Sequence, residues 1–288
     1  MKAKKMILID LNQVLIANLM QQVNAAPKMQ LDEPLIRHMV LNSLRSYIKQ
    51  FKGQYGEIVI CCDSKKYWRR DYFPFYKSNR KKDREKSGHD WNLIFETLNK
   101  IREELKIYFP YKVLEVEGAE ADDIIAVLAG RVSPQEDILI LSSDKDFVQL
   151  QKYKNVIQYS PILKKFVKSD NPHQYIKEHI LKGDRGDGIP NFLSADNVFA
   201  LGERQKVINS KKLTEWLSKS PEEFCVNDTM LRGYKRNQQL VDLDFIPEPI
   251  KQGIVEAYDN TKPNTRQKMM TYFIENRLKN LIEVLDEF

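Results

Sequence analysis

The sequence predicts an α/β protein with a doubly wound, mostly parallel sheet and a smaller, mainly helical C-terminal domain. Short apolar runs alternate with longer stretches of helical period, which is the order of a parallel sheet covered by helices. Acidic residues end several of these runs. Beyond residue 182 strand signals are weak and polar residues are frequent. We therefore expect one domain over residues 1–182 and a second over residues 183–288.

The first elements have clear beginnings and ends. The run MILID, which ends at Asp10, is expected to be the first strand. Its four apolar residues are too few for a signal peptide. A helix is expected to begin after Asp32, with Pro34 in its first turn, and to end at Gly53. Apolar residues recur along it with helical spacing. The run IVICCD, which ends at Asp63, is the second strand.

Later elements continue the alternation of strands and helices. Asp90 is the expected N-cap of a helix. Strands are expected at residues 113–116 and 138–141, with a helix that opens in GAEADD between them. The segment NVIQYSPILKKFVKS turns near Pro161 and predicts a hairpin at the edge of the sheet.

Composition excludes several classes of protein. No apolar stretch approaches the roughly 18 residues that a membrane span needs. Cys61 and Cys62 are adjacent and Cys225 is distant, so neither a disulfide framework nor a zinc pattern is present, and the four histidines have no ligand spacing. We expect a monomer in a reducing compartment, the cytoplasm, or the host cytoplasm if the chain comes from a phage.

The acidic strand ends predict a metal site. The carboxyl ends of parallel strands lie along one edge of a sheet, where open α/β sheets bind ligands. At least five carboxylates would meet there, and such a cluster needs a counter-charge. Divalent cations, which prefer oxygen ligands, would supply this counter-charge. The first interpretation is therefore a Mg²⁺ or Mn²⁺ site.

A basic segment predicts the substrate. Lys65 to Lys86 contains ten Lys or Arg against three Asp or Glu, a balance of +7, whereas the whole chain carries +6. Six aromatic residues are interleaved with these charges. Cations bind phosphates and rings stack on unpaired bases, so an acidic pocket beside this segment predicts a metal-dependent nuclease. The alternative is a solvated charge run beside ordinary core aromatics.

Several motifs in one order resemble the flap endonuclease and 5′-to-3′ exonuclease family, and within it the ribonucleases H of T-even-type bacteriophages. They are CCDSKKYWRRDYFPFYKSNR, EADD, SSDKDF, LKGDRGD, LGER and VDLDFIP. The resemblance spans nearly the whole chain. It implies a Mg²⁺-dependent 5′-to-3′ nuclease that acts on RNA–DNA hybrid, duplex DNA and 5′ flaps and removes lagging-strand primers. It also implies a single-strand binding protein and a sliding clamp as partners.

The resemblance implies two Mg²⁺ ions, for which Mn²⁺ would substitute. It places Asp10, Asp63, Asp122 and Asp144 around the first ion and Asp146, Asp184 and Asp187 around the second. Glu120 is expected to bind through water. Asp123 is either at the edge of the site or an ordinary residue of the first helical turn.

Basic residues receive roles from the same resemblance. Lys77 and Arg80 would hold the scissile phosphate, with help from Arg70. The basic bridge covers about residues 65–90. Further contacts with nucleic acid are expected from Lys65, Lys66, Arg69, Tyr76, Lys81, Lys82, Arg84, Lys86, Lys182, Arg185 and Arg204.

The chain departs from the family after GDRGD, where the glycines of a duplex-binding hairpin are replaced. Two other functions compete with the family assignment. A single-strand ribonuclease of the PIN type would share the acidic sheet edge but would be shorter. A non-catalytic nucleic-acid-binding module would have no use for the carboxylates. The C-terminal segment TYFIENRLKNLIEVLDEF is either a partner surface or a packed helix.

Overall fold

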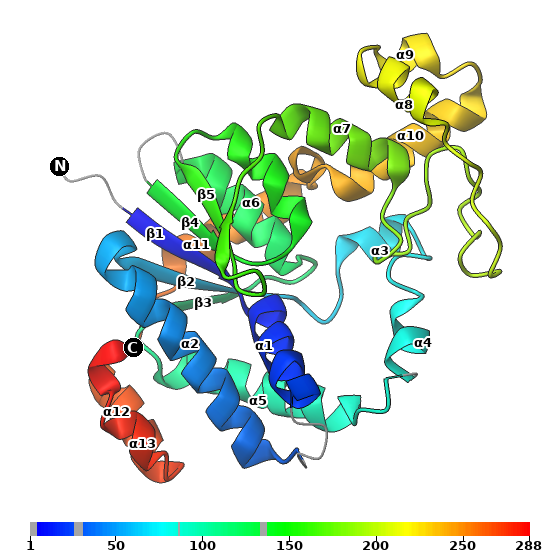
Figure 1. Ribbon diagram of the computed structural model, residues 1–288. Helices are drawn as coiled ribbons and strands as arrows, with labels where there is room; N and C mark the ends of the chain where they lie inside the picture. Colours follow the sequence, from blue (N-terminus) through cyan, green and yellow to red (C-terminus); the bar gives the residue numbers. More distant parts are fainter. Residues whose placement is uncertain (1–4, 26–30, 86, 133–136) are drawn as a thin grey trace.

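The computed structural model describes residues 5–25, 31–85, 87–132 and 137–288 (Figure 1). A six-stranded sheet with the order β3-β2-β1-β4-β5-β6 forms the centre. Strands β1 to β5 pair in parallel, and β6 is antiparallel to β5, so the predicted fold and the edge hairpin are confirmed. The strands are β1 (Lys5–Asp10), β2 (Glu57–Cys62), β3 (Lys112–Glu115), β4 (Asp137–Leu141), β5 (Val156–Ser160) and β6 (Lys165–Val167).

The strand order reverses at β1, which lies between β2 and β4. The chain builds outward from β1 to β3 on one side and then returns to β4 on the other. In doubly wound sheets such a reversal opens a crevice at the carboxyl ends of the strands. Asp10, at the end of β1, and Asp144, just after β4, lie at this position.

Helices cover both faces of the sheet (Figure 1). Alternate strand residues supply the two cores: Ile7 and Ile9 pack with α1, α2 and α5, whereas Met6 and Leu8 pack with α6 and α11. The helices are α1 (Leu11–Ala25), α2 (Glu33–Tyr55), α3 (Trp68–Tyr72), α4 (Arg80–Glu85), α5 (Trp91–Tyr108), α6 (Ala121–Val132), η1 (Lys145–Lys152), α7 (Pro172–Lys182), α8 (Ser210–Leu217), α9 (Pro221–Phe224), α10 (Asp228–Val241), η2 (Leu243–Phe245), α11 (Glu248–Asn260), α12 (Arg266–Glu275), α13 (Lys279–Ile282) and η3 (Leu285–Glu287).

The expected helix caps are present. The Asp32 carboxylate accepts from the Leu35 backbone N–H at 2.9 Å, and Asp90 accepts from the Leu93 N–H at 3.0 Å. Helix α2 was predicted to end at Gly53, but it continues to Tyr55. The residue with positive φ that ends it is Gly56, at 75°.

The chain after residue 182 does not form one separate helical domain. Helices α7 to α10 enclose a small core that includes Phe192, Trp216 and Phe224. The chain then returns to the first domain, where α11 packs on one face of the sheet and the α12–α13 segment joins the core of the other face (Figure 1). Residues on both sides of the predicted boundary therefore share the cores of the sheet, while α7 to α10 have a core of their own. The boundary at residue 182 stays a prediction.

The C-terminal segment is a packed element. Tyr272, Phe273 and Leu281 are buried in the same core as α2 and α5. These apolar side chains hold the segment on the sheet domain and are not exposed to a partner. Within the described residues, no helix has the length and apolar character needed to cross a membrane.

Candidate active site

A cavity of about 460 Å³ lies at the carboxyl ends of β1, β2 and β4. Residues from the basic segment line it together with acidic residues from the strand ends and the start of α6. The acidic residues are Asp10, Asp63, Glu120, Asp122 and Asp144, and the basic ones are Arg70, Lys77, Arg80 and Arg84. The structure thus brings together the two features that the sequence suggested separately.

Two carboxylates are fixed where β1 and β4 end. Asp10 accepts from the Gln13 backbone N–H at 3.1 Å and from the Ser142 hydroxyl at 3.0 Å. Asp144 is the N-cap of η1 and accepts from the Asp146 N–H at 3.0 Å. Asp10 directly precedes α1 and Asp144 directly precedes η1, so the first helical turns hold these carboxylates.

Asp63 connects three elements at the cavity. Its carboxylate accepts from the Asn12 side-chain amide at 2.9 Å and from the Ala121 backbone N–H at 2.8 Å. Ala121 begins α6, so this bond fixes the helix start that carries Asp122. The contact explains why EADD, far along the chain, joins the ends of β1 and β2.

The acidic cluster has more negative charge than the protein neutralises. Burial, followed by repulsion from Asp63 and Asp144, raises the pKa of Asp10 to about 7. Burial and the charges of Asp144 and Asp10 raise the pKa of Asp122 well above its ordinary value. A divalent cation with oxygen ligands would supply the missing charge, so these residues fit a Mg²⁺ or Mn²⁺ site.

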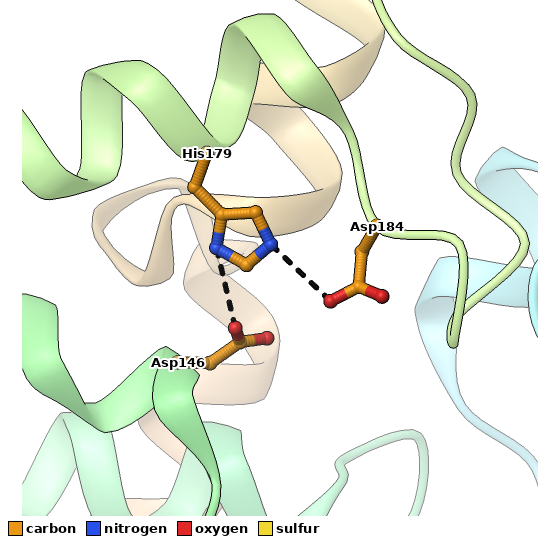
Figure 2. A group of neighbouring side chains, drawn as sticks. All are labelled: Asp146, His179 and Asp184. Atoms are coloured by element: carbon orange, nitrogen blue, oxygen red, sulfur yellow. Dashed lines mark hydrogen bonds and ion pairs between the residues drawn. The ribbon is translucent and has the colours of Figure 1, made fainter.

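A second group lies where η1 meets α7 (Figure 2). The His179 ring lies between two carboxylates, with Nδ1 3.3 Å from Asp146 Oδ1 and Nε2 3.2 Å from Asp184 Oδ2. One potential ligand atom from each residue lies within 4.8 Å of the other two. Burial, followed by repulsion from Asp144, raises the pKa of Asp146 to about 7.

Asp184, one of the expected ligands of the second metal, is already bound by several donors. Lys145 Nζ is 2.9 Å from its Oδ2, and its Oδ1 accepts from the Gly186 backbone N–H at 2.7 Å. Burial opposes ionisation, but the hydrogen bonds from His179 and Lys145 hold the pKa of Asp184 well below its usual range.

Asp187 also forms bonds, with residues of the basic segment. It pairs with Arg80, and it accepts from the Tyr76 hydroxyl at 2.9 Å. Lys77 Nζ is 3.7 Å away. Burial works in the opposite direction, but Lys77 and Arg80 hold the pKa of Asp187 below its ordinary value. The carboxylate therefore anchors the expected phosphate-binding residues.

Lys77 is the basic residue that reaches deepest into the cavity. Its Nζ is 2.5 Å from Glu120 Oε1, and its backbone N–H donates to the Asp187 carbonyl at 2.7 Å. Burial alone would lower its pKa, but Asp187 and Glu120 raise that pKa well above its ordinary value. Lys77 is therefore a permanent cation, and its φ of 57° shows that the backbone turns sharply there.

Arg69 was predicted to contact nucleic acid, and the structure shows that this prediction is wrong. Its side chain is only 2% exposed and forms ion pairs with Glu120 at 2.9 Å and Asp123 at 2.8 Å. It also donates to the Leu240 carbonyl at 2.9 Å. Asp123 is completely buried and accepts from the Glu120 backbone N–H at 3.0 Å, so it is part of the helix start and not a cavity residue.

Tyr76 needs a similar correction. It is buried, and its hydroxyl donates to Glu120 as well as to Asp187. Its ring is therefore not available to stack on a base. Two half-buried rings line the cavity, those of Tyr67 and Phe95, and Arg70 lies over the Tyr67 ring at 5.2 Å from its centroid.

The other residues expected to bind nucleic acid lie mostly at the surface. Arg84 is partly covered and lies 5.2 Å from the Phe95 ring centroid. Lys86 and the side chains of Lys81 and Lys82 fall outside the described residues. The exposed ones are Lys65, Lys66, Lys182, Arg185 and Arg204.

Sequence reasoning missed three residues of this region. Asn12 and Gln13 line the cavity beside Asp10 and orient its neighbours. His179 was dismissed because the histidines have no ligand spacing along the chain. The available signal was its position. His179 lies in the last turn of α7, just before the LKGD motif, beside the buried Ile180.

Comparisons with known proteins agree over the whole chain. A family model of the 5′-3′ exonuclease N-terminal, resolvase-like domain matches residues 5–180, and a model of the T4 RNase H C-terminal part matches residues 171–288. Ribonuclease H of Enterobacteria phage T4 is 38% identical over 98% of this chain and 95% of its own length. A 5′-3′ exonuclease of Buchnera aphidicola subsp. Acyrthosiphon pisum is 28% identical over 81% of this chain and 85% of its own length.

Solved structures share the fold. The T5 flap endonuclease, solved with DNA and metal ions, has a TM-score of 0.61 at 17% identity and covers 88% of this chain and 99% of its own. T5 5′-exonuclease with bound zinc has a TM-score of 0.58 and covers 89% of this chain and 98% of its own. With both of its parts matched and the acidic cavity in place, the chain belongs to the 5′-3′ exonuclease family, in the branch of T4 ribonuclease H.

Proposed function

We propose that this protein is a Mg²⁺-dependent 5′-to-3′ nuclease that hydrolyses phosphodiester bonds in RNA–DNA hybrid, duplex DNA and 5′ flaps. We further propose that it removes lagging-strand primers during phage DNA replication. The observation that carries the proposal is the cavity that five carboxylates line together with Lys77, Arg80 and Arg70. The carboxylates suit divalent cations and the basic side chains suit a phosphate, so the cavity suits a phosphodiester with its metal ions.

The carboxylates divide into two groups. Asp10, Asp63, Asp122 and Asp144 would hold one cation, and Asp146 with its neighbours would hold the second. When bound, two divalent cations lower the pKa of a water and stabilise the charge on the leaving oxygen. The raised pKa values of Asp10 and Asp146, both about 7, support a role for these groups as cation ligands.

Lys77 and Arg80 would act on the phosphate itself. Lys77 stays protonated because Asp187 and Glu120 hold its charge in place, and Glu120 also fixes the position of its Nζ. A fixed cation stabilises charge that develops on a phosphate oxygen without reorganising during the reaction. Arg80, paired with Asp187 and more exposed, is placed to meet the same phosphate from the solvent side.

The substrate would extend from the cavity over basic surface. Tyr67 offers a ring for a base, and Arg70 lies over that ring. A second cavity of about 420 Å³ connects Asn79 with Arg185 and Arg204. The Asn79 side-chain amide donates to the Arg185 carbonyl at 2.8 Å, so this contact joins the basic segment to the loop after α7. We propose that Arg185 and Arg204 there hold duplex phosphates in place of the family's glycine hairpin.

Labelled substrates test the proposal directly. RNA–DNA hybrid, 5′-flap and single-stranded RNA substrates would be incubated with the full chain in Mg²⁺ and in chelator. Release of short products from the 5′ end, only with Mg²⁺, is expected for the hybrid and the flap. Cleavage of single-stranded RNA alone would favour the PIN-type alternative, and binding without cleavage would favour a non-catalytic module.

A further inference from the structure

The position expected for the second metal contains a nitrogen donor, the imidazole of His179. This side chain is 7% exposed and lies on α7, in the turn before Asp184. Its Nδ1 and the Oδ1 of Asp146 are buried and have no hydrogen-bond partner in the part of the chain that the structure describes. These two atoms face each other at 3.3 Å (Figure 2). The two atoms satisfy each other only when the ring is protonated. Beside a neutral ring both lack a partner, and a positive group that both would bind satisfies them.

The other ring nitrogen fixes the orientation of the imidazole. Nε2 forms a hydrogen bond with Asp184 Oδ2 at 3.2 Å. Asp184 is itself held by Lys145 and by the Gly186 backbone N–H, so it cannot rotate away without losing several bonds. A neutral ring that donates from Nε2 directs the lone pair of Nδ1 toward Asp146. Histidines that bind metals almost always donate their second N–H to a carboxylate, a backbone carbonyl or a water, and Asp184 is such a partner.

We propose that His179 is a nitrogen ligand of the second divalent cation, with Nδ1 and the Asp146 carboxylate as two of its donors and Asp184 as the residue that orients the ring. The inference rests on the proposed function and specifies its second metal site. Imidazole favours first-row transition ions, whereas Mg²⁺ prefers oxygen ligands. The second site should therefore select Co²⁺ over Mg²⁺ through His179.

A protonated ring is the competing arrangement. An imidazolium would donate to Asp146 and Asp184 together and would neutralise part of their charge. Such a ring would compete with a cation, so its removal would leave metal binding unchanged or make it tighter. Removal of a ligand has the opposite effect and weakens binding of nitrogen-preferring ions most.

Metal titrations without nucleic acid separate the two arrangements. The probes are Co²⁺ and Mg²⁺, added to the full chain and followed by calorimetry at neutral pH. In His179→Gln the Co²⁺ affinity of one site should fall about tenfold or more, whereas Mg²⁺ affinity should change less than about threefold. His173→Gln changes an exposed histidine on the same helix and should leave both affinities unchanged. Melting in chelator shows whether each variant is folded.

A spectroscopic measurement needs no variant. Pulsed electron paramagnetic resonance of Mn²⁺ bound to the unmodified chain should show coupling to a nitrogen nucleus, and His179→Gln should lose it. Absence of this coupling in the unmodified chain overturns the proposal, as does an equal loss of Co²⁺ and Mg²⁺ affinity or tighter Co²⁺ binding in the variant. An inactive protein with the nitrogen coupling would reject only the proposed function. An active protein without it would reject only this inference.

Discussion

At the scale of single residues, Lys77 and Arg69 belong to one basic segment, and both form ion pairs with Glu120. Lys77 lines the cavity, whereas Arg69 lies behind Glu120 and bonds to Asp123 as well. Glu120 is thus held between a cation that lines the cavity and a cation that belongs to the core. Arg69 positions Glu120, and Glu120 positions Lys77.

Lys77→Ala should reduce the single-turnover cleavage rate by about 100-fold or more, with little change in substrate affinity. The reason is that a fixed cation acts mainly on charge that develops during the reaction. Single-turnover cleavage and equilibrium binding measure the two quantities separately. Lys65→Ala changes an exposed lysine of the same segment and is the control, in which bound substrate should be cleaved at the normal rate. A Lys77→Ala protein that binds tenfold more weakly but cleaves bound substrate normally would contradict the catalytic role.

Arg69→Met should lower the free energy of unfolding by about 3–5 kcal/mol, because it leaves Glu120 and Asp123 buried without their common counter-charge. Arg232→Met is the matched control. Arg232 pairs with Asp196, but its side chain is 60% exposed, so its loss should cost about 1 kcal/mol or less. Denaturant unfolding of both variants measures the difference. Equal losses would show that the buried pairs contribute no more than the surface pair.

The sequence could identify the basic segment but not the direction of each side chain in it. Ten cations carry the same signal in the sequence, and only packing shows that Arg69 and Tyr76 point inward. His179 was missed for a related reason. Its partners, Asp146 and Asp184, come from different elements, so no spacing along the chain could reveal the group.

At the scale of elements, two helical glycines show how different the surroundings of one residue type can be. A Cβ at Gly53, in α2, would meet nothing within 4 Å. A Cβ at Gly233, in α10, would lie 2.0 Å from the Phe192 carbonyl oxygen. Helix α10 therefore needs a glycine to approach the loop after α7, and that loop carries Asp184 and Asp187.

Gly53→Ala should stabilise the protein by about 0.5–1 kcal/mol, since alanine loses less entropy in a helix and meets no obstacle. Gly233→Ala should destabilise it by about 1–3 kcal/mol, because the loop after α7 must move. Thermal melting compares the two variants in one experiment. If Gly233→Ala is as stable as the unmodified chain or more stable, the close approach of α10 to Phe192 does not limit the fold.

The strands and the first helices were predictable because one physical rule decides each of them. Apolar runs between turn signals gave β1, β2 and β4, and side-chain caps at Asp32 and Asp90 marked two helix starts. The return of α11 to α13 was not predictable in this way. An amphipathic helix shows the same pattern whether it packs on its own neighbours or on a distant sheet.

At the scale of the whole molecule, the acidic cluster couples stability to pH and to metal. Asp10 and Asp146 both have a folded pKa of about 7, and their unfolded pKa is about 3.9. Between these values the folded state binds more protons than the unfolded state, so stability falls as pH rises. His179 acts in the same direction, since its pKa is raised in the folded state despite its burial, through Asp184 and Asp146. The lowered pKa of Asp184 changes little in this range, because its contribution is complete above its unfolded pKa.

In chelator, the melting temperature should therefore fall as pH rises from about 5 to 8. Mg²⁺ should reduce or reverse this slope, because cations replace the protons and stabilise the folded state by about 2.7 kcal/mol at a hundred times the dissociation constant.

Asp122→Asn should melt higher than the unmodified chain in chelator near pH 7.5, since it relieves repulsion with Asp144 and Asp10, and should gain less from Mg²⁺. Glu117→Gln, at an exposed carboxylate outside the cluster, is the control. Melting curves over this pH range, with and without Mg²⁺, decide the matter. A chelator profile that rises with pH, or a lower melting temperature for Asp122→Asn, would mean that these carboxylates do not repel one another in the metal-free protein.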